Sequence, residues 1–222
     1  MRIRAALFDL DGTLLDRRTT FRRHLELQLA RHPDMFTEAA GVRYVDRLLE
    51  LDENGYLDRG EFYDRAETEF GLRRGSAAIL VADFERHFPE ECVPFPNLRE
   101  TLSSLRAMGL KLGLITNGRG LIQRRKLRRL DLETSFDALV ISEELGCRKP
   151  DARIFAHALS VLEEPADAAV YVGDNPEPDV LGAKGAGLHA IWRRDEFWDE
   201  PPEADHVIDD LAEVPRWIRG FE

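Results

Sequence analysis

Residues 3–13 read Ile-Arg-Ala-Ala-Leu-Phe-Asp-Leu-Asp-Gly-Thr, a short apolar run that ends in two carboxylates and a glycine. A run of this length that stops at a glycine turn predicts a buried strand. Between residues 98 and 192, further short apolar runs alternate with segments of helical spacing. This alternation is typical of α/β proteins, in which helices cover both faces of a parallel sheet. The sequence therefore predicts a doubly wound, Rossmann-like parallel sheet.

Periodicity also predicts where the single elements of this core lie. Short apolar runs mark the strands, and apolar positions repeating at helical spacing mark the helices. The predicted helices are 98–107, 121–130, 154–162 and 180–186, and the predicted strands are 110–115, 138–141, 168–172 and 188–192. Residues 206–208 and 211–218 are expected to add a last edge strand and a helix.

An insertion interrupts the α/β pattern between its first and second strands. From residue 16 to residue 94 the apolar positions follow helical spacing throughout, so this segment is expected to be an all-helical domain. Pro94-Phe95-Pro96 ends it, because two prolines so close together cannot lie inside a helix. We therefore predict a core formed by residues 1–15 and 95–222 and an inserted helical cap formed by residues 16–94.

Composition narrows the classes of protein to which the chain can belong. A length of 222 residues suffices for one core and a small accessory domain. No apolar stretch approaches the roughly 20 residues of a membrane-spanning helix, and no signal-peptide pattern opens the chain, so a cytoplasmic protein is expected. The formal charge of -11 argues against a nucleic-acid binder. The sequence leaves the oligomeric state open, and a monomer is compatible with it.

One local basic run departs from the acidic balance. It comprises Arg124, Arg125, Lys126, Arg128 and Arg129. Leucine and isoleucine side chains at 121, 122, 127 and 130 are spaced to line the opposite side of one helix. We interpret the basic run as the solvated face of that helix.

Polar residues directly follow several of the predicted strands. In a parallel α/β sheet, ligands bind beyond the carboxyl ends of the strands, so these residues are candidates for a site. Asp9 and Asp11 follow the first strand, and as a pair two residues apart they would point to one side of an extended segment. Asp9 can attack phosphorus as a nucleophile. Asp11 can protonate a leaving oxygen and later accept a proton from water, as a general acid and base.

Three further residues suit the binding of a phosphate group. Thr116 offers a hydroxyl, and Asn117 or Gly118 offers a backbone N–H at the start of a predicted helix, where anions are favoured. Lys149 supplies a positive charge that would neutralise the nucleophile and the transferred group. Helix capping by the Thr116-Asn117 pair is an equally good explanation of that pair alone.

The acidic residues of the site require a cation. Asp9, Asp174 and Asp179 would all repel a phosphate dianion if they converged on it. Mg²⁺ prefers one or two carboxylates together with phosphate oxygens and water. We therefore expect a magnesium ion to be the cofactor.

Four short motifs occur in order along the chain. They are Asp9-Leu10-Asp11-Gly12-Thr13, Thr116-Asn117, Lys149-Pro150 and Gly173-Asp174-Asn175-Pro176-Glu177-Pro178-Asp179. In this order they resemble the four signature motifs of the haloacid dehalogenase superfamily. The resemblance covers the predicted core segments, and the helical insertion lies where that family carries its first-type cap.

The resemblance implies a magnesium-dependent phosphatase acting on a small phosphorylated metabolite. It implies a nucleophilic Asp9, an acid/base Asp11, phosphate contacts from Thr116 and Lys149, and metal contacts from Asp9, Asp174 and the backbone carbonyl of Asp11. It further implies that Asp179 is either a second carboxylate at the metal or the partner that orients Lys149. Both roles of Asp179 stay open at this point.

Three alternative functions are compatible with parts of the pattern. A sugar phosphomutase of the same superfamily uses the same aspartate pair and differs in its cap. A carbon–halogen hydrolase would need no metal, and Asp11 argues against it. A partner-binding protein without activity would have no need for the full set of Asp9, Asp11, Lys149 and Asp174.

Residues 50–61 resemble a calcium-binding EF-hand loop. Asp52, Asn54 and Glu61 stand at its third, fifth and twelfth positions, but Glu50 stands at the first position, where that loop normally has aspartate. A turn between two helices, closed by Asn54 and Gly55, is the alternative interpretation, which we prefer.

Overall fold

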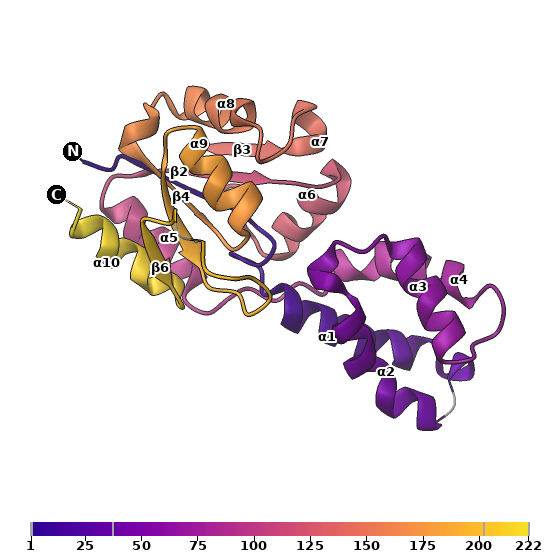
Figure 1. The fold of residues 1–222 in the computed structure, drawn as a ribbon. Helices are drawn as coiled ribbons and strands as arrows, with labels where there is room; N and C mark the ends of the chain where they lie inside the picture. The colour runs from indigo at the N-terminus through magenta and orange to yellow at the C-terminus, as the bar shows by residue number, and fades with distance from the viewer. Residues whose placement is uncertain (1, 37, 202, 222) are drawn as a thin grey trace. The chain divides into compact units, whose positions relative to one another are not determined.

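The computed structural model describes residues 2–36, 38–201 and 203–221, with the side chains of residues 38–42 left out. The chain forms two compact units, Met1–Asp16 with Pro94–Glu222, and Arg17–Val93. Figure 1 shows the α/β elements of the first unit and the helices of the second. Among the described helices, none has both the length and the apolar character needed to cross a membrane.

A six-stranded parallel sheet forms the centre of the first unit, which confirms the predicted α/β fold. Its strand order is β3-β2-β1-β4-β5-β6. The strands are β1 Ala5–Phe8, β2 Lys111–Thr116, β3 Ala138–Ile141, β4 Ala169–Gly173, β5 His189–Arg193 and β6 His206–Ile208. The first strand lies between β2 and β4, so the residues that follow it are flanked on both sides.

Helices precede or follow most strands of the sheet along the chain. They are α5 Leu98–Ala107, α6 Gly120–Arg129, α7 Ser142–Leu145, α8 Ala152–Leu162, α9 Gly182–Gly185 and α10 Val214–Arg219. The helix predicted at 180–186 begins earlier, as a π-helical turn at Pro176–Leu181. It can do so because proline is tolerated in the first turn of a helix and because the Asn175 side chain accepts a hydrogen bond from Glu177 N.

Alternating side chains of the strands form the core on the two faces of the sheet. Leu7 and Tyr171 lie in one apolar cluster with Phe155 and Leu159 of α8. Neighbouring residues in a strand point to opposite faces, so the buried Phe8 faces the other side of the sheet from Leu7. Both faces are therefore buried, as expected for parallel strands.

The two points at which the insertion leaves and re-enters the core lie side by side. Leu15 forms an antiparallel bridge with Pro94. Phe95 N donates a hydrogen bond to Leu14 O over 2.9 Å. These contacts belong to the first unit and close the core across the insertion.

The second unit is all-helical, as predicted for the insertion. Its α-helices are α1 Arg17–Arg31, α2 Glu38–Leu51, α3 Arg59–Glu69 and α4 Ser76–His87. Aromatic side chains dominate its core, with Phe21, Tyr44, Phe62 and Tyr63 fully buried.

A buried ionic network lies within the core of the helical unit. Arg31 donates to Asp83 through Nε and Nη2, at 2.8 and 2.7 Å, and to Glu91 Oε1 through Nη1 at 2.7 Å. His24 Nδ1 lies 2.7 Å from Glu91 Oε2, and Gln28 Nε2 donates to Asp83 Oδ2 at 3.0 Å. Burial alone would raise the pKa of Asp83 and of Glu91, but these donors hold both pKa values below their ordinary range.

We expect Arg31→Met to destabilise the protein by about 2 kcal/mol at pH 7, because it leaves two buried carboxylates without their main cation. The pKa values of Asp83 and Glu91 are lowered in the folded protein, so the stabilisation exists above the unfolded pKa of about 4 and is lost as the pH falls. The difference from wild type should therefore shrink at pH 3. Urea denaturation followed by far-UV circular dichroism measures both values.

Arg47→Met is the matched control for this prediction. Arg47 also pairs with two carboxylates, Glu50 at 2.9 Å and Glu69 at 2.7 Å, but this group is exposed. Exposed ion pairs contribute little to stability, so the control should change little. Equal losses in the two variants would contradict the importance of the buried network.

Candidate active site

The candidate residues gather beyond the carboxyl ends of the three central strands. Asp9 directly follows β1, Thr116 ends β2, and Asp174 directly follows β4. Because β1 lies between β2 and β4, these three positions are neighbours at one edge of the sheet. Asp9 N donates to Val172 O over 2.9 Å, which fixes the backbone where β1 ends.

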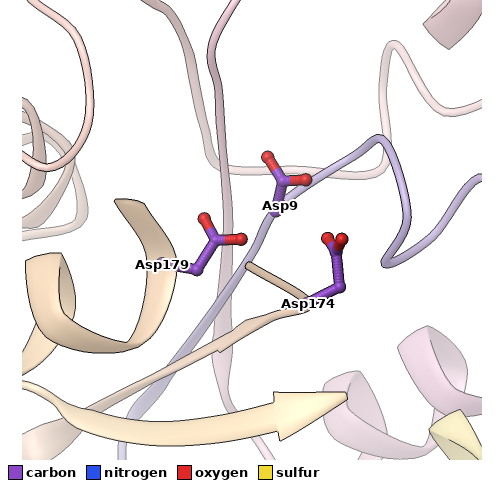
Figure 2. A group of neighbouring side chains, drawn as sticks. All are labelled: Asp9, Asp174 and Asp179. Carbon is purple, nitrogen blue, oxygen red and sulfur yellow. The ribbon is translucent and has the colours of Figure 1, made fainter. Parts of the chain in front are cut away.

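Three buried carboxylates meet at this edge, and we call Asp9, Asp174 and Asp179 the carboxylate cluster. One oxygen from each lies within 4.8 Å of the other two, and Figure 2 shows the three side chains together. Asp9 follows strand β1, Asp174 follows strand β4, and Asp179 belongs to the π-helical turn after it. Their exposures are only 6%, 4% and 1%, so they must be neutralised by neighbours, protons or a cation.

Lys149 neutralises one side of the carboxylate cluster. Its Nζ donates to Asp9 Oδ1 at 2.5 Å, to Asp179 Oδ1 at 2.6 Å and to the Tyr171 hydroxyl at 2.8 Å. Burial would lower the pKa of Lys149, but the carboxylates of Asp179 and Asp9 outweigh it and raise that pKa above its ordinary value. The Tyr171 hydroxyl donates in turn to Ile115 O at 3.0 Å. The ammonium group is thus held at a defined position between two aspartates.

Asp174 is positioned from both its side chain and its backbone. Thr13 Oγ1 donates to its Oδ1 at 3.0 Å, and Trp192 Nε1 donates to its carbonyl oxygen at 2.5 Å. A methyl group on Gly12 would overlap the Asp174 carboxylate, and Gly12 has a φ of +86°. Glycine is therefore required at this position both by the backbone conformation and by the close approach of the carboxylate.

The acid–base properties of the cluster follow from its burial. Burial raises the pKa of Asp9 to about 7, with Asp179 adding to the shift and Lys149 opposing it. Burial also raises the pKa of Asp174 well above its ordinary value, and the charges of Asp179 and Asp9 add to that shift. A single lysine is not enough to keep three carboxylates ionised. The set of buried oxygen ligands fits a hard divalent cation, which would supply the missing charge.

The Asp11 side chain is not a member of the carboxylate cluster. Its two oxygens accept hydrogen bonds from Lys126 Nζ at 2.7 and 2.8 Å, and Oδ2 also accepts from Gln123 Nε2 at 2.9 Å. Both donors belong to α6. Asp11 therefore lies at the same end of the sheet, with its carboxylate held by the helix that follows β2.

The structure assigns different contacts to the two residues of the second motif. The buried Thr116 hydroxyl accepts a hydrogen bond from Gln123 Nε2 at 2.6 Å. The Asn117 side chain binds the backbone of Lys149, since its Oδ1 accepts from Lys149 N at 2.9 Å and its Nδ2 donates to Lys149 O at 3.0 Å. The backbone N–H of Gly118 donates to Ser142 Oγ at 3.0 Å. Helix α6 begins only at Gly120, so the segment 117–119 precedes it.

Both roles that the sequence left open for Asp179 have a structural counterpart. Its Oδ1 accepts from Lys149 Nζ, and its Oδ2 accepts from Asn175 N at 3.0 Å. It is also a member of the carboxylate cluster. A methyl group on Gly173 would overlap the Asp179 side chain, so the glycine at the end of β4 permits this close approach.

Three residues of the site were missed by sequence reasoning, namely Tyr171, Gln123 and Lys126. The interpretation of residues 124–129 as a solvated face was wrong for Lys126, which is 7% exposed, and Leu121, expected to be buried, is 69% exposed. A signal was present, because Gln123 and Lys126 share the helical spacing of the buried Leu127 and Leu130. Two polar side chains on a buried face indicate a polar partner in the interior.

The EF-hand-like residues serve structural roles in the helical unit. Asp52 forms ion pairs with Arg17 and, at 2.7 Å, with Arg59. Asp58 Oδ1 accepts from Gly60 N at 2.9 Å and caps α3. Asn54 has a φ of 52° and lies in the turn Glu53–Gly55 between α2 and α3, which agrees with the interpretation as a turn between two helices. Within the described part of the chain, residues 50–61 do not bring three possible metal ligands together.

Comparisons with known proteins agree with this geometry. A glyceraldehyde 3-phosphate phosphatase from Methanopyrus kandleri is 33% identical over 227 residues, which cover 96% of this chain and 94% of the relative. A phosphoserine phosphatase from Thermus thermophilus is 41% identical over 160 residues, covering 70% of this chain and 64% of the relative.

A solved structure extends the likeness to the whole fold. The magnesium-bound HAD-hydrolase YfnB from Bacillus subtilis has a TM-score of 0.77 and 25% identity, with 98% of this chain and 99% of that chain covered. The family model for haloacid dehalogenase-like hydrolases matches residues 3–187, a range that includes Asp9, Asp11, Thr116, Lys149, Asp174 and Asp179. This chain therefore belongs to the haloacid dehalogenase-like hydrolase family.

Proposed function

We propose that this protein is a magnesium-dependent phosphatase that hydrolyses a small phosphate monoester through an aspartyl-phosphate on Asp9. The observation that carries the proposal is the placement of Asp9, a buried carboxylate 2.5 Å from the Lys149 ammonium and within 4.8 Å of two further carboxylates. A dianionic phosphate fits such a site only where positive charge is concentrated. The phosphatase names of the relatives support this choice of substrate class.

The first half of the proposed reaction transfers the phosphoryl group to the protein. One Asp9 oxygen attacks phosphorus and forms a new O–P bond, while the bond between phosphorus and the leaving oxygen breaks. Asp11 donates a proton to the leaving oxygen, so that an alcohol departs instead of an alkoxide. The Asp9 carboxylate is thereby converted to an aspartyl-phosphate, and the alcohol is released.

The second half of the proposed reaction restores Asp9. A water molecule attacks phosphorus, and Asp11, now ionised, accepts its proton. The bond between phosphorus and the Asp9 oxygen breaks, and inorganic phosphate leaves. Asp11 ends protonated and is ready for the next substrate.

The other residues of the site would bind and orient the transferred group. The Thr116 hydroxyl and the Lys149 ammonium are proposed to contact phosphate oxygens. Asn117 supports Lys149 by binding its backbone on both sides, and we propose this positioning role for its side chain. Asp179 orients the same lysine through its hydrogen bond of 2.6 Å.

The cation would be held by Asp9, Asp174 and the backbone carbonyl of Asp11, with Asp179 beside them. Mg²⁺ bound there supplies positive charge against the carboxylates and the phosphate. We also propose that the helical unit 17–93 acts as the cap that excludes water from the reaction and selects the substrate. A cytoplasmic location and the absence of a nucleic-acid partner stay predictions.

Asp9→Asn is expected to abolish magnesium-dependent hydrolysis of p-nitrophenyl phosphate, because an amide cannot form the aspartyl-phosphate. Steady-state assays with and without Mg²⁺ measure this loss. Asp167→Asn is the control, since Asp167 is exposed and lies at the opposite end of β4 from Asp174. Full activity of Asp9→Asn would refute the proposed nucleophile, and an inactive wild type would refute the proposed reaction for aryl phosphates.

Mg²⁺ is expected to raise the melting temperature of the wild type and to have little effect on Asp174→Asn, because binding to the folded state alone stabilises it. The wild-type effect should grow as the pH rises through about 7. The pKa of Asp9 is raised to about 7 without a cation, and the carboxylate must lose its proton before it can bind one. Thermal melts at several pH values test both statements, and an equal Mg²⁺ effect in the variant would exclude Asp174 as a ligand.

A further inference from the structure

Two polar side chains of α6 hold the Asp11 carboxylate in place. Lys126 Nζ donates to both of its oxygens, at 2.7 and 2.8 Å, and Gln123 Nε2 donates to Oδ2 at 2.9 Å. Residues three apart on a helix lie on the same face, so Gln123 and Lys126 approach Asp11 from one side. We call this pair the α6 clamp.

The burial of the α6 clamp sets it apart from the rest of its helix. Gln123 is 2% exposed and Lys126 is 7% exposed, whereas the neighbouring Arg124 and Arg128 are exposed. Burying a lysine or a glutamine is costly unless its polar atoms are satisfied, and such side chains are seldom buried without a partner. Here Asp11 is a partner that both side chains share.

Gln123 also connects Asp11 to the proposed phosphate-binding hydroxyl. The same Nε2 that donates to Asp11 donates to Thr116 Oγ1 at 2.6 Å. The hydroxyl is the acceptor in this contact, so its own hydrogen can be directed to another oxygen. The Gln123 amide therefore sets the relative positions of the Thr116 hydroxyl and the Asp11 carboxylate. The first is proposed to contact the phosphate oxygens, and the second is proposed to protonate the leaving oxygen bonded to phosphorus.

We propose that Gln123 and Lys126 are positioning residues that hold the Asp11 carboxylate for proton transfer to the leaving oxygen. This inference rests on the proposed function and deepens it. The Asp11 side chain is 24% exposed and precedes a glycine, so without the clamp it can adopt other rotamers. General acid catalysis depends on a proton donor held within hydrogen-bond reach of its target.

The leaving group distinguishes this role from a merely structural one. Phenol has a pKa of about 10, close to that of tyrosine, and departs poorly without a proton. The nitro group makes p-nitrophenol a better leaving group, although the two aryl phosphates have similar shapes. Displacing Asp11 should therefore harm the hydrolysis of phenyl phosphate more than that of p-nitrophenyl phosphate. A general loss of structure would harm both equally.

The test compares Lys126→Met and Gln123→Met with wild type on these two substrates, at saturating Mg²⁺. We expect kcat/KM to fall about 100-fold for phenyl phosphate and about tenfold for p-nitrophenyl phosphate, within the range of general acid catalysis. The Mg²⁺-induced rise in melting temperature should be retained, because the clamp does not contact Asp174. Lys126→Arg, which keeps a donor toward Asp11, should recover part of the kcat/KM lost on phenyl phosphate.

Arg128→Met is the matched control, since it removes an exposed cation from the same helix, where Arg128 reaches Glu133 at 3.4 Å. It should leave both rates unchanged. Equal losses on the two substrates, or no loss, would overturn the inference. If Lys126→Met fails to fold, the comparison of Gln123→Met with wild type decides alone. An inactive Asp9→Asn together with normal clamp variants would refute only the clamp, whereas an active Asp9→Asn would refute the proposed function itself.

Discussion

The Lys149 ammonium is the interaction on which the site depends. It lies between Asp9 and Asp179, at 2.5 and 2.6 Å, in a region where all three side chains are almost fully buried. Without Lys149, three buried carboxylates would lie together with no positive side chain bonded to them. Protonation would then be the only way for the chain itself to reduce their mutual repulsion. Much of the surrounding structure serves this one group, since Tyr171 binds its Nζ and Asn117 binds its backbone. Lys149 therefore offsets part of the negative charge of the cluster, and a cation would offset the rest.

The topology of the sheet explains why residues so distant in sequence can meet there. Strand β1 is central, with β2 and β4 paired to it in parallel register, so the chain leaves all three strands at the same edge. Small residues then permit close approach, because Gly12 contacts the Asp174 carboxylate and Gly173 contacts the Asp179 side chain. The sheet topology thus brings the carboxylates to one edge, and the two glycines leave room for the side chains of Asp174 and Asp179.

The sequence predicted the sheet and the approximate position of each candidate residue, because strand ends in a parallel sheet can be located from apolar runs alone. It could not predict which side chains bind to which. Tyr171 lies inside an apolar run and reads as an ordinary core residue, although its hydroxyl reaches Lys149. Lys126 lies in a basic run and is predicted to be exposed, although it is buried and donates a hydrogen bond to Asp11. Lys126 and Asp11 are 115 residues apart, and Lys149 and Tyr171 are 22 residues apart. Local periodicity carries no information about contacts between such separate segments.

The bridge between Leu15 and Pro94 has a consequence for how the protein can be modified. Because Phe95 N also bonds to Leu14 O, the core joins the two ends of the insertion by its own contacts. For the stability of the core, the helical unit therefore acts as a long loop whose two ends are held together by contacts of the core. The entropic cost of closing a loop rises only slowly with its length. Helical units of different size could replace one another at this junction with little effect on the stability of the sheet. Under the proposed role of the helical unit as a cap, exchanging that unit would change the substrate preference while the residues at the strand ends stay the same.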